Sequence, residues 1–206
     1  MQDTDKERSG SPRVTRSIST RQAKNLLAAF DHAERIDCPL NTHVIIHWAG
    51  TANMAARVPD RIQLLLARMR HWLDRRNVRF CHIWAQEPSR NSDVPHMHLL
   101  VHVPHVWREA FEAQVEEWVD GIGTDNAMKI VTVRQSRNWH WREYLVKGVN
   151  PKTRDEELRA ILKRQRKASN ARGPVEGKRC GVSQNTLGPA ARAAWEASNP
   201  QYAMAG

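Results

Sequence analysis

The 206-residue chain is poor in the residues that build disulfide frameworks and membrane spans. Its three cysteines, Cys38, Cys81 and Cys180, are scattered, odd in number and never spaced C-x-x-C, which favours reduced thiols. No run approaches the roughly 18 apolar residues that a membrane span needs. Residues 1–17 are polar and lack the apolar stretch of a secretory signal. We therefore expect a cytoplasmic protein with no membrane partner.

Two further shortages bear on function. The chain has only two tyrosines, Tyr144 and Tyr202, so any chemistry that needs two tyrosines on one helix is excluded. The stretch from Gly173 to Arg179 is one residue short of a phosphate-binding loop and lacks its final hydroxyl. The chain therefore has no helicase motor of that kind, and unwinding of a duplex would depend on host proteins.

Acidic residues are scarce relative to basic ones. The 22 Asp and Glu against 32 Lys and Arg give a formal net charge of +10 at pH 7. Residues 151–206 contain 11 of the basic and 5 of the acidic residues, so the excess is concentrated at the C-terminal end. This charge predicts an anionic partner, and nucleic acid fits best.

The spacing of apolar residues predicts alternating helices and strands over residues 19–150. Helices are expected over 20–35, 59–76, 106–119 and 138–147, and strands over 41–48, 78–86, 94–103 and 128–134. This order predicts an α+β fold, with an antiparallel sheet of about four to five strands and helices packed on one face. Residues 1–18 are expected to form a disordered arm. Residues 151–206 are expected to form a basic, partly irregular extension.

His96 and His98 lie two residues apart in the apolar run from Pro95 to Pro104. Side chains alternate between the faces of a strand, so both imidazoles are expected on one face. His102 shares that face and is expected to play a supporting or surface role. An ordinary pair of half-buried histidines is the alternative interpretation, because so short a motif also arises by chance.

Glu87 is the best candidate for a third ligand beside the two histidines. It lies at the end of the strand expected over 78–86, directly after Gln86, and the turn that follows should bring it next to the start of the histidine strand. Two imidazoles and a carboxylate suit Mg²⁺ or Mn²⁺, in preference here to Zn²⁺. The alternative is that Glu87 has only a structural role at the end of its strand.

Tyr144 and Lys147 are three residues apart on an expected helix and so share a face. Tyrosine can act as a nucleophile that conserves the energy of a broken phosphodiester, and the lysine can hold negative charge beside it. As alternatives, Tyr144 could be a core aromatic, and Lys147 a cation that interacts with the helix dipole.

The ordered set of Glu87, His96, His98, Tyr144 and Lys147 resembles the HUH endonucleases, and among them the single-tyrosine replication initiators and transposases. The resemblance covers roughly residues 41–150 and implies a ferredoxin-like or RRM-like fold. It implies a divalent metal on His96, His98 and Glu87, with Tyr144 as the nucleophile and Lys147 as its helper. The implied activity is nicking and rejoining of single-stranded DNA through a 5′-phosphotyrosyl intermediate.

The implied partner is single-stranded or hairpin origin DNA, with host helicase and polymerase, in rolling-circle replication. A transposase of the same chemistry is one alternative, and a non-catalytic single-strand-binding protein is another. Aromatic rings can stack on unpaired bases, and basic side chains can contact phosphates. The residues expected to contact DNA in these ways are Trp139, Trp141, Arg142, Lys163, Arg164, Arg166 and Lys167.

Overall fold

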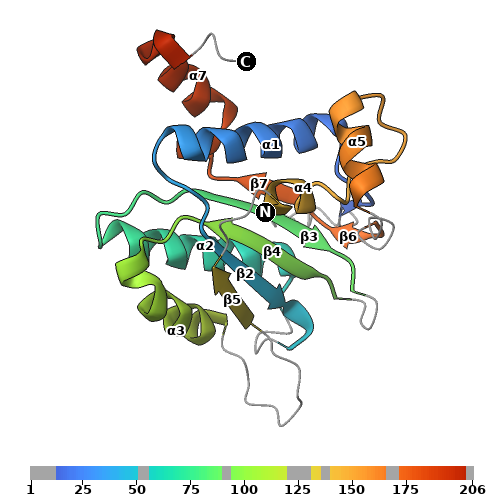
Figure 1. The fold of residues 1–206 in the computed structure, drawn as a ribbon. Helices are drawn as coiled ribbons and strands as arrows, with labels where there is room; N and C mark the ends of the chain where they lie inside the picture. Colours follow the sequence, from blue (N-terminus) through green and yellow to red (C-terminus); the bar gives the residue numbers. More distant parts are fainter. Residues whose placement is uncertain are drawn as a thin grey trace, which may run out of the picture.

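The computed structural model describes residues 13–50, 56–89, 94–119, 131–135, 140–165 and 172–202. Within these ranges a five-stranded antiparallel sheet lies between helical layers (Figure 1). The strand order is β5-β2-β4-β3-β7. The α+β class and the antiparallel sheet expected from the sequence are confirmed. The strands of this sheet are β2 (Thr42–His47), β3 (His82–Glu87), β4 (His96–Val101), β5 (Val131–Gln135) and β7 (Cys180–Val182).

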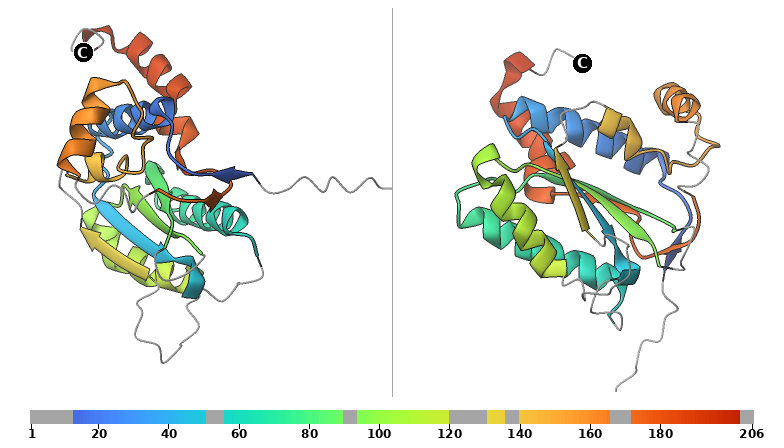
Figure 2. Two further views of the ribbon diagram at one scale, coloured as in Figure 1. Left: turned by 90° about the vertical axis from the view of Figure 1, so that its right-hand side faces the viewer. Right: turned by 60° about the horizontal axis from the view of Figure 1, so that its bottom comes forward.

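Two helices, α2 (Val58–Asp74) and α3 (Arg108–Val119), cover one face of the sheet and of its central strand β4 (Figure 2). Met97, Leu99 and Val101 point to this side and belong to one buried cluster with apolar side chains of both helices. Alternation along β4 therefore places its apolar face against these two helices.

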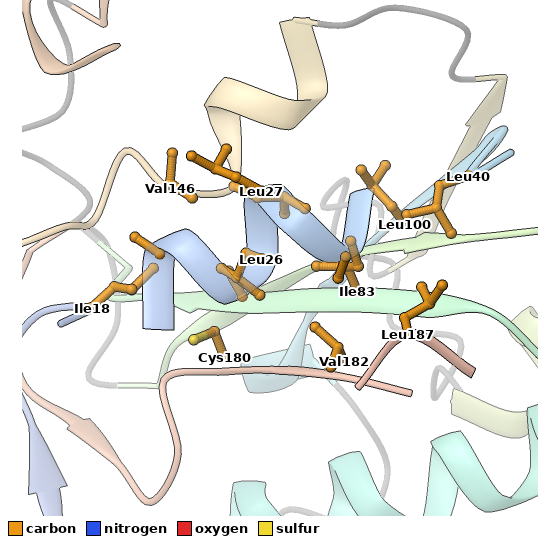
Figure 3. Close-up of a cluster of buried hydrophobic side chains, with 14 of the residues drawn as sticks. Ile18, Leu26, Leu27, Leu40, Ile83, Leu100, Val146, Cys180, Val182 and Leu187 are labelled. Atoms are coloured by element: carbon orange, nitrogen blue, oxygen red, sulfur yellow. The ribbon is translucent and has the colours of Figure 1, made fainter. Parts of the chain in front are cut away.

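The second face of the sheet is covered as well, whereas the sequence predicted helices on one face. Helix α1 (Thr20–Arg35) lies across it, as both views in Figure 2 show. The helix begins with a capping box, in which Ser19 and Gln22 exchange hydrogen bonds. Leu26 and Leu27 pack in one buried cluster with Leu100 of β4 (Figure 3).

The C-terminal segment belongs to the same folded unit. β7 pairs with β3, placing Val182 opposite Ile83, and Leu187 is fully buried in the core under α1 (Figure 3). The sheet and the core therefore continue past residue 150, where the sequence predicted a boundary. The other elements of this part are α5 (Glu156–Arg164), β6 (Val175–Glu176), α6 (Gln184–Leu187) and α7 (Pro189–Ser198).

The N-terminal residues 13–18 are ordered too, although they were expected in a disordered arm. β1 (Val14–Thr15) pairs with β6 in a separate two-stranded sheet. The backbone amide of Ile18 donates to the carbonyl of Gly148, and its own carbonyl accepts from Asn150. Such short paired segments have too few residues to show a periodic pattern.

Leu187→Ala is expected to lower the free energy of unfolding by about 2–5 kcal/mol, the usual cost of emptying a buried leucine site. Chemical denaturation followed by circular dichroism measures it. Leu64→Ala on α2 is the matched control, because Leu64 is 50 % exposed and should cost no more than about 1 kcal/mol. Equal effects of the two substitutions would mean that the C-terminal segment does not stabilise the domain.

Within the described ranges, no helix combines the length and the apolar character that crossing a bilayer requires.

Candidate metal centre

Strands β3 and β4 bring together one carboxylate and two imidazoles. Their antiparallel register places Glu87 opposite His96, and Ala85 opposite His98. Because residues two apart share a face, all three ligand-type side chains project from the side of the sheet that α1 covers. The register therefore places Glu87 on the same face of the sheet as His96 and His98.

The distances within this cluster suit a single divalent ion. Glu87 Oε2 lies 3.4 Å from His96 Nε2, and Glu87 Oε1 lies 3.6 Å from His98 Nε2. One possible ligand atom from each residue lies within 4.8 Å of the others. Two ligands of an ion at about 2.1 Å lie roughly 3.0–3.4 Å apart, so only small shifts would close the site around an ion. Glu87, His96 and His98 could therefore hold a metal.

Burial and charge determine the protonation of these groups. Burial alone would raise the pKa of Glu87, but hydrogen bonds from His96 and His98 and nearby positive charge outweigh it and hold that pKa well below its usual range. Burial lowers the pKa of His98, although Glu87 opposes the shift. A carboxylate beside a neutral imidazole is the form in which both groups bind metals.

Tyr144 ends helix α4 (His140–Tyr144) and reaches this cluster. Its Oη lies 3.4 Å from His98 Nε2, and its ring packs edge-on against the His98 ring. Lys147 Nζ lies 3.5 Å from the centre of the Tyr144 ring and 2.9 Å from Glu87 Oε2. Residues from two strands and from the segment after β5 thus meet at one point.

The electrostatics of this region keep the tyrosine protonated in the absence of a ligand. Burial raises the pKa of Tyr144, and the negative charge of Glu87 raises it further. Burial lowers the pKa of Lys147, an effect that Glu87 partly offsets. A phenolate would therefore need more positive charge than Lys147 alone provides.

Ion pairs fix the short helix that carries Tyr144. The Arg142 guanidinium contacts both Asp31 carboxylate oxygens at 2.7 and 2.8 Å and Glu157 at 3.0 Å. Glu143, which is buried, accepts two hydrogen bonds from Arg164. Five residues are too few for a helix that is stable by itself, so these contacts to α1 and α5 hold it in place.

These pairs change the interpretation of the residues expected to contact DNA. Arg142 and Arg164 are engaged by carboxylates of the protein itself, which the sequence did not reveal because the partners lie far away along the chain. Trp141 is half-buried, and its ring packs 3.8 Å from that of His43. Lys163 is exposed. Trp139, Arg166 and Lys167 lie outside the described residues.

His102 does not join the cluster. It follows the end of β4, and its Nδ1 lies 2.9 Å from the carbonyl oxygen of Pro39. The expectation that it is not a ligand agrees with this position.

Two histidines of β2 lie beside the cluster, although the sequence was not interpreted to place them there. His43 Nε2 lies 3.1 Å from His98 Nδ1, and the ring of His47 stacks on that of His96 at 5.3 Å. Burial and the neighbouring His98 lower the pKa of His43 to about 3, so it is neutral. The signal was present in the sequence, because residues four apart on a strand share a face and Val44 and Ile46 occupy the other one.

No family model, curated protein or solved structure matches the chain. The fold and the cluster themselves define the chain as an α+β protein with a buried Glu/His/His group that could bind a metal ion.

Proposed function

We propose that the protein nicks and rejoins single-stranded DNA in a metal-dependent reaction through a covalent tyrosine intermediate, as HUH endonucleases do, to initiate rolling-circle replication. The observation that carries the proposal is the 3.4 Å separation of Tyr144 Oη and His98 Nε2 at the Glu87–His96–His98 cluster. Transposition by the same chemistry would use the same residues.

In the proposed reaction, the Tyr144 oxygen attacks a DNA phosphorus atom. A bond forms between Tyr144 Oη and phosphorus, the bond from phosphorus to O3′ breaks, and the departing O3′ takes up the proton that the phenol loses. The 5′ phosphate stays on the enzyme, and attack by a 3′-OH reverses the step and rejoins a strand. A divalent cation on Glu87, His96 and His98 would polarise a non-bridging phosphate oxygen and offset its charge.

Lys147 has two contacts that suit this role. Its ammonium lies against the face of the Tyr144 ring and pairs with Glu87. Positive charge at this place favours the phenolate and the phosphate that approaches it. The net charge of +10 favours binding of the DNA backbone in general.

The proposal is tested with a pool of single-stranded oligonucleotides of random sequence. We expect the full-length protein with Mn²⁺ or Mg²⁺ to form a denaturation-resistant adduct with a subset of the pool. The sequences attached to the protein identify the target. Chelator and the fully double-stranded pool are the controls. Metal binding without any adduct would reject the proposed enzyme in favour of a non-catalytic single-strand-binding protein.

Glu87→Gln is expected to raise the Mn²⁺ concentration for half-maximal adduct formation by about 10–100-fold, the range for disturbed metal surroundings. The amide keeps the shape of the side chain but loses the charge that attracts the cation. Glu116→Gln is the matched control, because Glu116 is exposed on α3 across the sheet. An unchanged metal titration in Glu87→Gln would remove Glu87 from the ligand set.

A further inference from the structure

His43 is the buried neighbour of a proposed metal ligand. Its side chain is fully buried on β2, and its ring stacks on the His98 ring with centroids 5.3 Å apart and planes inclined by 22°. Trp141 covers it from the side of α4. A histidine in this place is held in a single orientation between the sheet and the helix that carries the tyrosine.

The two nitrogens of His98 have different neighbours. Nε2 faces Glu87 Oε1 and Tyr144 Oη, whereas Nδ1 faces His43 Nε2 at 3.1 Å. A nitrogen that binds a metal must be unprotonated. Neutral His98 with a metal on Nε2 therefore carries its proton on Nδ1, and His43 Nε2 is the atom that can accept it in a hydrogen bond.

The same hydrogen bond determines the proton on His43. If His43 Nε2 accepts, the neutral His43 ring carries its own proton on Nδ1. That nitrogen is buried and has no hydrogen-bond partner among the described residues. The proton positions of the two rings are thus coupled, because the reverse arrangement places the His98 proton on the nitrogen that faces Glu87.

We propose that His43 is a positioning residue, which holds the His98 ring in the orientation and tautomer that leave Nε2 free for the metal. This role rests on the proposed metal-dependent function. Ligand histidines commonly donate their second N–H to a carboxylate, a carbonyl or water. Here a second imidazole takes that place, and it does so from β2, the strand next to the one that carries His96 and His98.

The first test compares Mn²⁺ affinity by calorimetry in three full-length variants. His43→Leu removes the acceptor and retains an apolar side chain, and should weaken binding about 10–100-fold. His43→Gln places an amide oxygen near the former Nε2 position and should restore affinity to within a few-fold of the wild type. His82→Leu is the matched control, since His82 is also buried but packs against Phe80 away from the cluster.

The second test needs no variant. Nitrogen-15 NMR of the histidine rings distinguishes the two tautomers directly, with Zn²⁺ as a diamagnetic probe that imidazole and carboxylate ligands bind well. In the Zn²⁺-bound wild type we expect His98 and His43 both to be protonated on Nδ1. A His43 ring protonated on Nε2, or a His98 ring bound through Nδ1, would overturn the proposal even if His43→Leu failed to fold.

The outcomes separate this role from the proposed function. Wild-type affinity in a folded His43→Leu variant would reject the role of His43 and leave the metal site intact. A loss in His43→Leu that His43→Gln does not repair would mean that His43 matters only through packing, which also rejects the proposal. A wild-type protein that binds neither Mn²⁺ nor Zn²⁺ would reject the metal site itself, and the role of His43 with it.

Discussion

Tyr144→Phe is expected to abolish the covalent protein–DNA adduct while folding and single-strand binding survive. The substitution removes one oxygen and keeps the ring, which contacts His98, Trp141 and Lys147. We expect no neighbouring side chain to replace this nucleophile, because the hydroxyl oxygen that the structure places 3.4 Å from His98 Nε2 is that of Tyr144. The expected loss is complete, and a denaturing gel with labelled oligonucleotide measures it.

Tyr202→Phe is the matched control, because the chain has only these two tyrosines. Tyr202 is 51 % exposed near the C-terminal end, and its ring packs on Trp195. We expect wild-type adduct formation in this variant. An adduct that persists in Tyr144→Phe, or a peptide map that places the DNA on another residue, would contradict the single-tyrosine mechanism.

The part of the cluster that the sequence predicted depends on local geometry. The period of a strand puts His96 and His98 on one face, and a hairpin between neighbouring strands brings Glu87 opposite His96. The helical spacing of Tyr144 and Lys147 places both on one side of their segment, although the helix itself ends at Tyr144. Short-range rules were sufficient for each of these placements.

The parts that the sequence did not reveal depend on distant contacts. The pairing of Arg142 with Asp31 joins residues that are far apart in the chain, so a basic side chain was interpreted as a DNA contact. The contact between His98 and His43 could be predicted only with the strand order in hand. Alternation along β2 gives the face on which His43 lies, but not which strand lies beside it. The three-residue strand β7 was too short to produce a pattern.

The interpretation of the C-terminal segment changes for the same reason. Its basic composition predicted a partly irregular extension with side chains that contact DNA. In the structure, β7 extends the sheet beside β3, the strand that ends at Glu87. Deletion of this segment would therefore disturb the cluster of Glu87, His96 and His98 as well as any contact with DNA, and point substitutions are the better test of its role.

His98→Ala is expected to lower Mn²⁺ affinity by at least about 100-fold and to abolish nicking. Loss of a hydrogen-bond partner of a metal ligand lowers metal affinity by about 10–100-fold. Loss of the ligand itself should therefore reach the upper end of that range or exceed it. His98 is also the residue that joins Glu87, Tyr144 and His43, since its two nitrogens face all three side chains.

Thermal unfolding separates the loss of the metal from damage to the fold. A ligand present at 100 times its Kd stabilises the folded state by about 2.7 kcal/mol. Mn²⁺ should therefore raise the Tm of the wild type and of His82→Ala, a control that also removes a buried imidazole. The Tm of His98→Ala should rise much less, because a 100-fold weaker site stabilises the protein by only about 0.4 kcal/mol at the same Mn²⁺ concentration. A rise in Tm with Mn²⁺ that equals that of the wild type, together with chelator-sensitive nicking, would place the metal on other residues and remove His98 from the proposed centre.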